Sequence, residues 1–152
     1  MTLSWKSNMA MLVAVAAATS AMAGGFFLSF YSGSAPVAAG IGGVAVVVSS
    51  EGCATPGDTK LVGTAEGLAR GKRQSVKLEF TATKKPGVFA VKRQWPAEGA
   101  WVLSITGDNH GHSTRWLVEM APNGKYRPER AESGGALSAR IEQVLQAAAN
   151  AT

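Results

Sequence analysis

The sequence has one cysteine, Cys53, in 152 residues. A single thiol cannot close an internal disulfide, so the fold has to be stabilised by side-chain packing. A small buried thiol is the usual state of such a residue, and an intermolecular bond or a bound ion are the alternatives. No Cys-x-x-Cys pair occurs either, which leaves thioredoxin-like chemistry and c-type haem attachment without sequence support.

The chain also lacks the common catalytic motifs. Ser49 and Ser50 follow a β-branched run but are not part of a Gly-x-Ser-x-Gly elbow. The glycines of "GIGGVA", residues 40–45, precede a predicted strand and carry no phosphate-loop lysine. Glu79, Glu98 and Glu119 fall at solvent-facing or turn positions. The sequence therefore predicts a protein without enzymatic activity.

No charged residue lies between Lys6 and Glu51. One lysine, an apolar stretch and then small residues are the layout of a secretory signal, which predicts a periplasmic or secreted protein. Cleavage fits after Ala39, which would make residues 1–39 the signal, or after Ala23. The apolar run is also long enough to stay as an uncleaved membrane anchor.

The net charge of +5 is spread over the chain. The tightest basic clusters lie in residues 70–73 and 84–85, and no aromatic residues alternate with them. Single-stranded nucleic acid is bound by aromatic platforms beside basic grooves, so the sequence does not predict a nucleic-acid partner. Contact with a membrane is expected only through the N-terminal segment.

Residues 40–121 show the alternation typical of β-strands. In "SVKLEFTAT" the side chains of Val76, Leu78 and Phe80 point to one face, and a type II turn is expected where Pro86 and Gly87 follow. Short strands separated by turns at near-regular spacing predict a mainly β fold, an antiparallel immunoglobulin-like β-sandwich of about six to seven strands.

The C-terminal part has a different character. Residues 122–136 are polar and rich in glycine and proline, which is typical of a linker. Residues 137–150 place an apolar stripe at helical spacing, so one C-terminal helix is predicted there. The stripe is formed by Leu137, Ile141, Val144, Leu145 and Ala148. It is expected to pack on the sandwich, and the alternative is docking in the groove of a partner.

The stretch "KKPGVFAVKRQWPAEGAWVLSITG", Lys84 to Gly107, resembles part of small exported Ig-like domains of bacteria. The YtkA-like and FixH-like domains are the nearest in pattern, followed by the carboxypeptidase-regulatory-like domains. The resemblance covers about half of the chain after the signal and implies an Ig-like sandwich in the cell envelope. Trp101 would then be the largest filler of the core.

The stretch "TGDNHGHS", Thr106 to Ser113, contains both histidines of the chain. In an extended segment His110 and His112 share a face, so both rings could reach one copper, nickel or zinc ion. Asp108 would add an oxygen, and Met120 or Cys53 a soft sulfur for copper(I). The competing interpretation, which we favour on ligand number, is a seven-residue hairpin loop rich in turn formers.

Together these patterns predict a non-enzymatic secreted or periplasmic Ig-like module. It would need no cofactor and would bind an unknown envelope protein or polymer. The alternative prediction is a small periplasmic metal-binding domain of the copper type that uses the His110 and His112 loop.

Overall fold

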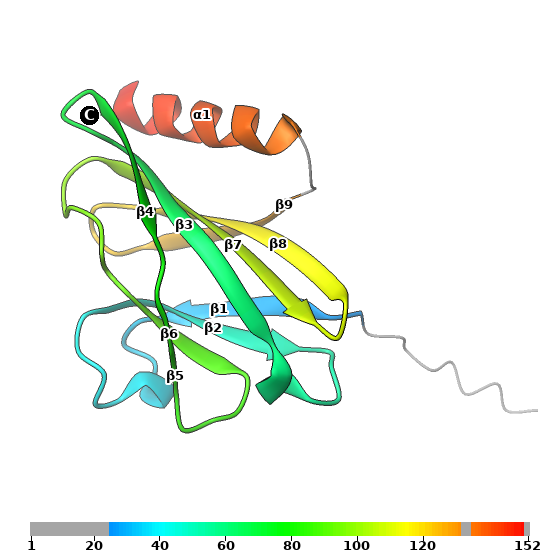
Figure 1. The fold of residues 1–152 in the computed structure, drawn as a ribbon. Helices are drawn as coiled ribbons and strands as arrows, with labels where there is room; N and C mark the ends of the chain where they lie inside the picture. Colours follow the sequence, from blue (N-terminus) through cyan, green and yellow to red (C-terminus); the bar gives the residue numbers. More distant parts are fainter. Residues whose placement is uncertain (1–24, 132–134, 151–152) are drawn as a thin grey trace, which may run out of the picture.

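A computed structural model describes residues 25–131 and 135–150 of the chain. The strands are β1 (Phe27–Ser32), β2 (Val44–Glu51), β3 (Lys60–Ala69), β4 (Lys72–Lys77), β5 (Phe80–Ala82), β6 (Val88–Lys92), β7 (Ala100–Asn109), β8 (His112–Met120) and β9 (Tyr126–Ala131). Helix α1 spans Gly135–Asn150, and two short 3-10 turns are η1 (Pro36–Ala38) and η2 (Pro56–Asp58). The strands form two antiparallel sheets, and the helix lies on one of them (Figure 1).

The two sheets have the strand order of an immunoglobulin-like sandwich. One sheet is ordered β1-β2-β6-β5 and the other β4-β3-β7-β8-β9. If β1 to β8 are lettered A, B, C, C′, D, E, F and G, these sheets read ABED and C′CFG, with β9 added beside G. The predicted antiparallel β-sandwich is therefore confirmed, with nine strands in the described residues in place of the six or seven expected.

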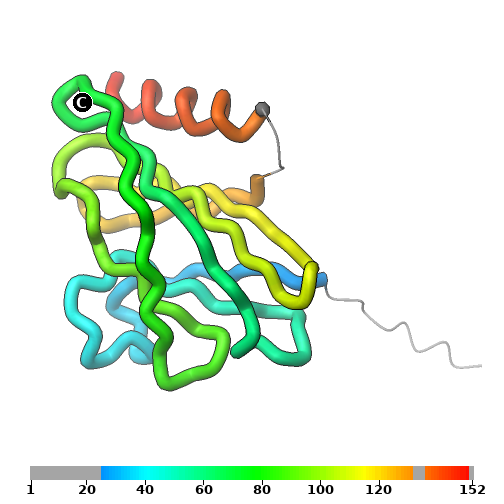
Figure 2. Tube along the Cα trace, viewed as in Figure 1, coloured from blue at the N-terminus to red at the C-terminus, as the bar shows by residue number. Residues whose placement is uncertain are grey.

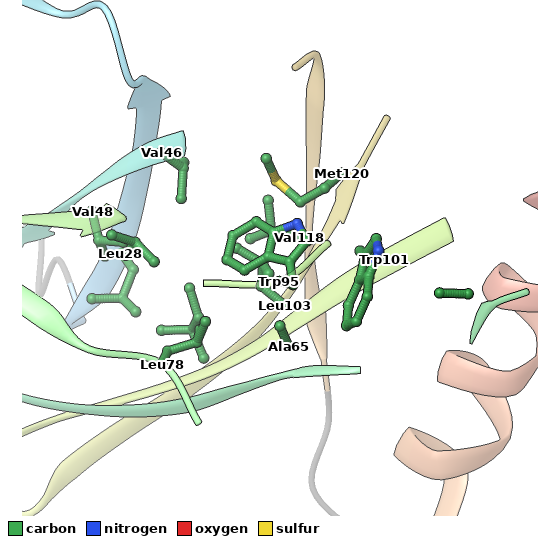
Figure 3. Packing of buried hydrophobic residues seen from close by; sticks show 13 residues of the cluster. Leu28, Val46, Val48, Ala65, Leu78, Trp95, Trp101, Leu103, Val118 and Met120 are labelled. Atoms are coloured by element: carbon green, nitrogen blue, oxygen red, sulfur yellow. The ribbon is translucent and has the colours of Figure 1, made fainter. Parts of the chain in front are cut away.

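The core lies between the sheets and is filled by alternate residues of the facing strands. Figure 3 shows Leu28, Val46 and Val48 of one sheet opposite Ala65, Leu103 and Val118 of the other, with Trp95 and Trp101 among them. Every one of these side chains is buried. Since no disulfide joins the sheets, this apolar contact is what holds them together.

Trp101 fits into this core because the residue opposite it has no side chain. Trp101 on β7 is paired across the ladder with Gly67 on β3. A Cβ atom on Gly67 would overlap the indole ring of Trp101. The indole N–H donates a hydrogen bond to the carbonyl of Glu98 at 2.8 Å, which satisfies its one polar group. The glycine that weakens β3 as a strand thus creates the space for its largest core neighbour.

The most regular strand pattern in the sequence proves to be two strands in different sheets. In the stretch "SVKLEFTAT", residues 75–77 belong to β4 of the five-stranded sheet, and Phe80 begins β5 of the four-stranded sheet. Leu78 crosses between them, with its N–H bonded to the carbonyl of Gly63 at 2.9 Å and its side chain buried. Alternation continues through the crossing because Leu78 still points inward, so periodicity alone could not reveal the change of sheet.

The prediction of a linker at residues 122–136 is wrong in part, because this segment contains strand β9. This strand pairs along β8 from Arg115 opposite Ala131 to Met120 opposite Tyr126. Most of its side chains are exposed, and Pro128 has no backbone N–H to donate to a ladder. A strand without a buried face carries no alternating apolar pattern, and sequence reasoning therefore had no signal for it.

The folded region also begins earlier than the expected sandwich boundary at residue 40. β1 pairs with β2 along its whole length and places Leu28 in the core. Ala38 of η1 is buried against Val47 and Val88 on the outer face of the four-stranded sheet. Both segments lie within the residues 1–39 assigned above to the signal. Ala23 and the apolar run before it lie outside the described residues.

The predicted turn after β5 is confirmed. The N–H of Val88 bonds to the carbonyl of Lys85 at 3.1 Å, which places Pro86 and Gly87 at the two central positions. Gly87 has a φ of 75°, as the third position of a type II turn requires.

Helix α1 packs on the domain's own sheet, as expected for the apolar stripe. It lies across the five-stranded sheet, on the side away from the four-stranded sheet (Figures 1 and 2). Ile141, Val144 and Leu145 are buried against Val102 of β7 and Leu117 of β8. In the parts of the chain that the structure describes, no helix has the length and apolar character needed to cross a membrane.

Ion pairs anchor the helix on both flanks. Arg140 contacts Glu129 of β9 at 2.8 Å, and Glu142 contacts Arg73 of β4 at 3.0 Å. Arg73 also lies 3.4 Å from Glu66 of β3. The two edge strands of the five-stranded sheet thus hold the helix across its width. Each pair is solvent-accessible and contributes less than the apolar stripe beneath it.

The Glu129–Arg140 pair predicts a pH dependence of stability. The hydrogen bond from Arg140 lowers the pKa of Glu129 below its ordinary value of 4.5. A carboxyl whose pKa is lower in the folded state stabilises the fold above its unfolded-state pKa, and this contribution is lost as the pH falls through the folded-state value. The free energy of unfolding should therefore fall less between about pH 7 and pH 3 in Glu129→Gln than in wild type. The difference should be below about 1 kcal/mol, because the pair is exposed.

Urea unfolding at the two pH values checks this. Glu79→Gln is the matched control, because the side chain of Glu79 makes no hydrogen bond or ion pair with the described residues. Equal pH dependence in wild type and Glu129→Gln would contradict the prediction.

Candidate functional site

The histidine stretch is a tight β-hairpin and not the seven-residue loop that was expected. β7 ends at Asn109 and β8 begins at His112, so only His110 and Gly111 form the loop. Their φ angles are 52° and 85°. Positive φ at both central positions is the mark of a type I′ turn, whose twist matches the flanking strands. Short turn chemistry, and not a long flexible loop, therefore sets the geometry of both histidines.

The side chain of His110 points to the connection between β2 and β3. Its Nε2 atom lies 3.0 Å from Oδ2 of Asp58 and 3.0 Å from Oγ1 of Thr55. Asp58 belongs to η2, and both contacts are exposed. Asp108, the oxygen ligand predicted from the sequence, instead accepts a hydrogen bond from the N–H of Gly111 at 3.3 Å. The structure thus gives His110 a different acidic neighbour from the one expected.

Asn109, which sequence analysis passed over, is the buried member of this cluster. Its Nδ2 atom donates to the carbonyl of Thr55 at 2.9 Å and to Oγ1 of Thr59 at 3.0 Å. Asn109 is 4% exposed and Thr59 6% exposed. We call the group of Thr55, Asp58, Thr59, Asn109 and His110 the hairpin clasp. It joins the tip of the β7–β8 hairpin to the connection that carries the chain from one sheet to the other.

The sulfur atoms proposed as copper ligands lie elsewhere. Met120 is at the opposite end of β8 from His112, roughly 25 Å away at the usual rise of a strand. Its side chain is buried in the core cluster. Cys53 is a free thiol in the connection after β2, half-buried where a fully buried position was expected.

The geometry of the clasp gives an ion few ligands. Within residues 25–131 and 135–150, no three His, Cys, Asp or Glu side chains converge on a point where they could hold one metal ion. The Nε2 atom of His110 is already engaged with Asp58, so an ion would have to replace that contact or use Nδ1. Zinc and copper sites with stable occupancy use three or four protein ligands. The predicted ligands His110, His112 and Asp108 are therefore not brought together as one three-ligand site in the described residues, since His110 contacts Asp58 and Asp108 bonds to the N–H of Gly111.

A cavity of about 430 Å³ lies at the opposite end of the sandwich. Trp95 and Met120 form part of its apolar lining, and Ser32 and Asn123 contribute polar groups. Its one charged lining residue is Arg93, whose Nη2 atom donates to the carbonyls of Pro96 and Ala97. This cavity offers apolar contact and a cation but no paired acid and base.

The carboxylates that sequence analysis considered lie at the surface. Glu98 pairs with Arg70 at 2.8 Å and Glu119 with Arg127 at 3.9 Å, and both pairs are exposed. A sequence signal for the clasp did exist in part, because Asn before a turn and Thr after a Pro-Gly-Asp loop are typical local capping residues. Their pairing over a separation of 50 residues depends on the fold.

No protein-family model, no curated protein and no solved structure matches this chain.

The clasp predicts a difference in stability between two adjacent residues. Asn109→Ala leaves the buried hydroxyl of Thr59 and the carbonyl of Thr55 without their donor, and should lower the free energy of unfolding by about 1–3 kcal/mol. His110→Asn keeps a residue that favours the left-handed conformation and should change the free energy of unfolding by less than about 0.5 kcal/mol. Urea unfolding measures both. A smaller effect for Asn109→Ala than for His110→Asn would contradict the clasp.

The metal-binding alternative has its own test. Calorimetric titration of the purified protein with copper(II) and with zinc should give no heat beyond that of a His110→Ala/His112→Ala variant, because the described ligands are too few for a stable site. A stoichiometric binding heat that disappears in the double variant would instead establish the histidine hairpin as a metal site.

Proposed function

We propose that this chain is an exported, non-enzymatic Ig-like module that binds another protein of the cell envelope. The observation that carries the proposal is the pair of exposed aromatic side chains on β1. Phe27 is 40% exposed and Tyr31 45% exposed. Both pair with outward-facing positions of β2, Glu51 and Val47, so they lie on the outer face of the four-stranded sheet.

Aromatic side chains on an exposed face are characteristic of protein interfaces. Phe27 and Tyr31 are two of the three large apolar side chains that stand exposed among the described residues, the third being Val62. Aromatic residues are enriched in interfaces because they bury a large area with little loss of conformational freedom. Their position on an edge strand makes the surface around β1 the best-supported contact region.

The hairpin clasp supports the non-enzymatic part of the proposal. Its polar groups bond to one another and connect two loops, which is a structural use. In this proposal the histidine hairpin maintains the end of the sandwich, and the metal-binding function is the alternative to be judged by the titration above.

The position of β1 bears on the export signal. Cleavage after Ala39 would remove β1 and η1, and with them Leu28 from the core and Ala38 from the outer face. Cleavage after Ala23 would keep every described residue. We therefore propose Gly24 as the first residue of the exported form, and the envelope as its location.

Site-specific photo-crosslinking in the cells that make the protein tests the proposal. A photoreactive phenylalanine analogue replaces Tyr31 in one variant and Thr81 in the other. Thr81 is the matched control, because it lies in the same row of the sheet as Tyr31, through Ala90 and Val47, but on the opposite edge strand.

We expect a covalent adduct with an envelope protein from position 31 and none from position 81, together with an intact mass that corresponds to a chain beginning at Gly24. Equal adducts from both positions, adducts with cytosolic proteins only, or no adduct would overturn the binding proposal. Turnover of a substrate by the purified protein would overturn the non-enzymatic part.

A further inference from the structure

The two sheets differ in width, and the difference leaves one strand uncovered. The four-stranded sheet ends at β1, and β1 contacts β8 of the other sheet. β9 lies one position beyond β8 in the five-stranded sheet, so it extends past the end of the smaller sheet. We call the space bounded by the free edge of β1 and the inner face of β9 the vacant strand position.

The inner face of β9 is identified by its register with β8. Pro128 is paired with Val118, and Arg130 with Trp116. Residues directly opposite in a ladder share a face, and Val118 is fully buried in the core. Pro128 and Arg130 therefore face the same side as the core, yet both are exposed. Tyr126, the third residue of this row, is half-buried against the core cluster. The uncovered part of the row is therefore at Pro128 and Arg130, and no strand of the described residues lies opposite these two positions.

The free edge of β1 has backbone groups to offer. The N–H of Ser50 bonds to the carbonyl of Gly87, which directs the backbone groups of Ser50 toward β6. By alternation, Ser49 is directed toward β1 and its partner Ser29 toward β2. The N–H and C=O groups of Leu28 and Phe30 consequently point to the free edge. In agreement, the Phe30 carbonyl accepts a hydrogen bond from the hydroxyl of Tyr126 on β9 at 3.2 Å.

Of the four edge strands that the structure describes, β1 alone lacks protection against strand pairing. β4 carries Lys72, Arg73 and Lys77, β5 has three residues, and β9 contains Pro128 among charged residues. Charges, proline and short length are the usual features that prevent a further strand from adding to an edge. The sequence of β1, "FLSFYS", contains none of them.

We propose that one extended strand of a partner protein pairs with β1 and fills the vacant strand position beneath β9. This inference rests on the proposed function, since it specifies how the module binds its partner. Backbone hydrogen bonds to the N–H and C=O of Leu28 and to the N–H of Phe30 provide the attachment, as in other cases of β-strand addition, while the Phe30 carbonyl keeps its bond to the hydroxyl of Tyr126. The strand completes the smaller sheet so that both sheets have the same width.

The surroundings of the vacant position define the chemistry of the strand. Arg130 forms no ion pair with a described residue, so a carboxylate on the strand would neutralise it. The indole N–H of Trp116 is buried and has no hydrogen-bond partner among the described residues, and an added strand brings acceptors to its vicinity. On the outer face, next to Phe27 and Tyr31, uncharged or aromatic side chains fit best. The occupant is thus a strand with one inward-facing acidic residue and otherwise uncharged side chains.

A second copy of this chain does not fit the same position. A second copy paired through its own β1 would bring its five-stranded sheet with it. In the second copy, as in the first, β8 lies over β1. The β8 of the second copy would therefore occupy the space that is already filled by β9 of the first copy. The overhang leaves room for a single strand, which favours an extended segment of a partner over a dimer.

Two synthetic peptides are the probes for this inference. Each has about eight residues of alternating valine and threonine, with either one glutamate or one lysine at an inward-facing position. Affinity is measured with the full-length protein by fluorescence anisotropy. We expect the glutamate peptide to bind about tenfold or more tightly than the lysine peptide, because only the glutamate complements Arg130.

A charge exchange gives the sharper test. Arg130→Glu should reverse the preference between the two peptides, and Arg127→Glu should leave it unchanged. Arg127 is the matched control, because it is paired with Glu119 and lies on the outer face of the same strand. Equal affinity for both peptides, an unchanged preference in Arg130→Glu, or no binding of either peptide would overturn the inference.

Hydrogen exchange locates the bound peptide. In the unbound chain the Leu28 and Phe30 amides should exchange fast, as expected for N–H groups at a free sheet edge. Binding of the peptide should slow their exchange. Slowed exchange elsewhere with no change at these two amides would overturn the inference. So would protection of these amides in the full chain that is lost in a chain beginning at Gly24, because the occupant would then be the protein's own N-terminal segment.

The outcome separates this inference from the proposed function. If photo-crosslinking from position 31 succeeds and Arg130→Glu forms the same adduct as wild type, the partner contacts the outer face of β1 without filling the vacant strand position, and only the strand position is refuted. If crosslinking fails as well, the proposed function itself is refuted.

Discussion

The structure depends on apolar contact between two sheets that no disulfide joins. The indole ring of Trp101 is the largest of the fully buried side chains in this contact, and it lies against the backbone of Gly67 on the neighbouring strand. Because the ring occupies the space of the missing side chain, strand β3 tolerates a glycine that would otherwise weaken it. A chain with one thiol can be stable in an oxidising compartment if its core is packed in this way.

Unequal sheet widths make the edges of the sandwich structurally different. The outer face of the larger sheet is covered by α1, which is fixed by apolar contact and by ion pairs to β4 and β9. No strand of the described residues lies beneath the opposite side of β9, and the neighbouring edge of β1 is uncharged. The protected and the open edges of one fold thus separate the part that maintains the structure from the part proposed to bind.

The hairpin clasp shows how a polar motif can serve the fold. His110 is a candidate metal ligand in the sequence, but its contacts, and those of the neighbouring Asn109, join the hairpin to the β2–β3 connection. A buried amide with two acceptors fixes the position of a loop that carries the chain from one sheet to the other. The same contacts leave a metal ion few free ligands at this tip.

Local pattern in the sequence determined the class of fold, the strands with one buried face, the type II turn at Pro86 and Gly87, and the apolar stripe of the helix. These features follow from spacing and from the conformational preference of single residues. The change of sheet at Leu78, the strand β9 without a buried face, the position of β1 and the pairing of Asn109 with Thr59 were decided by the tertiary structure alone. Each depends on which distant segment lies alongside, and a period of two residues records only that a side chain is buried and not which sheet or loop buries it.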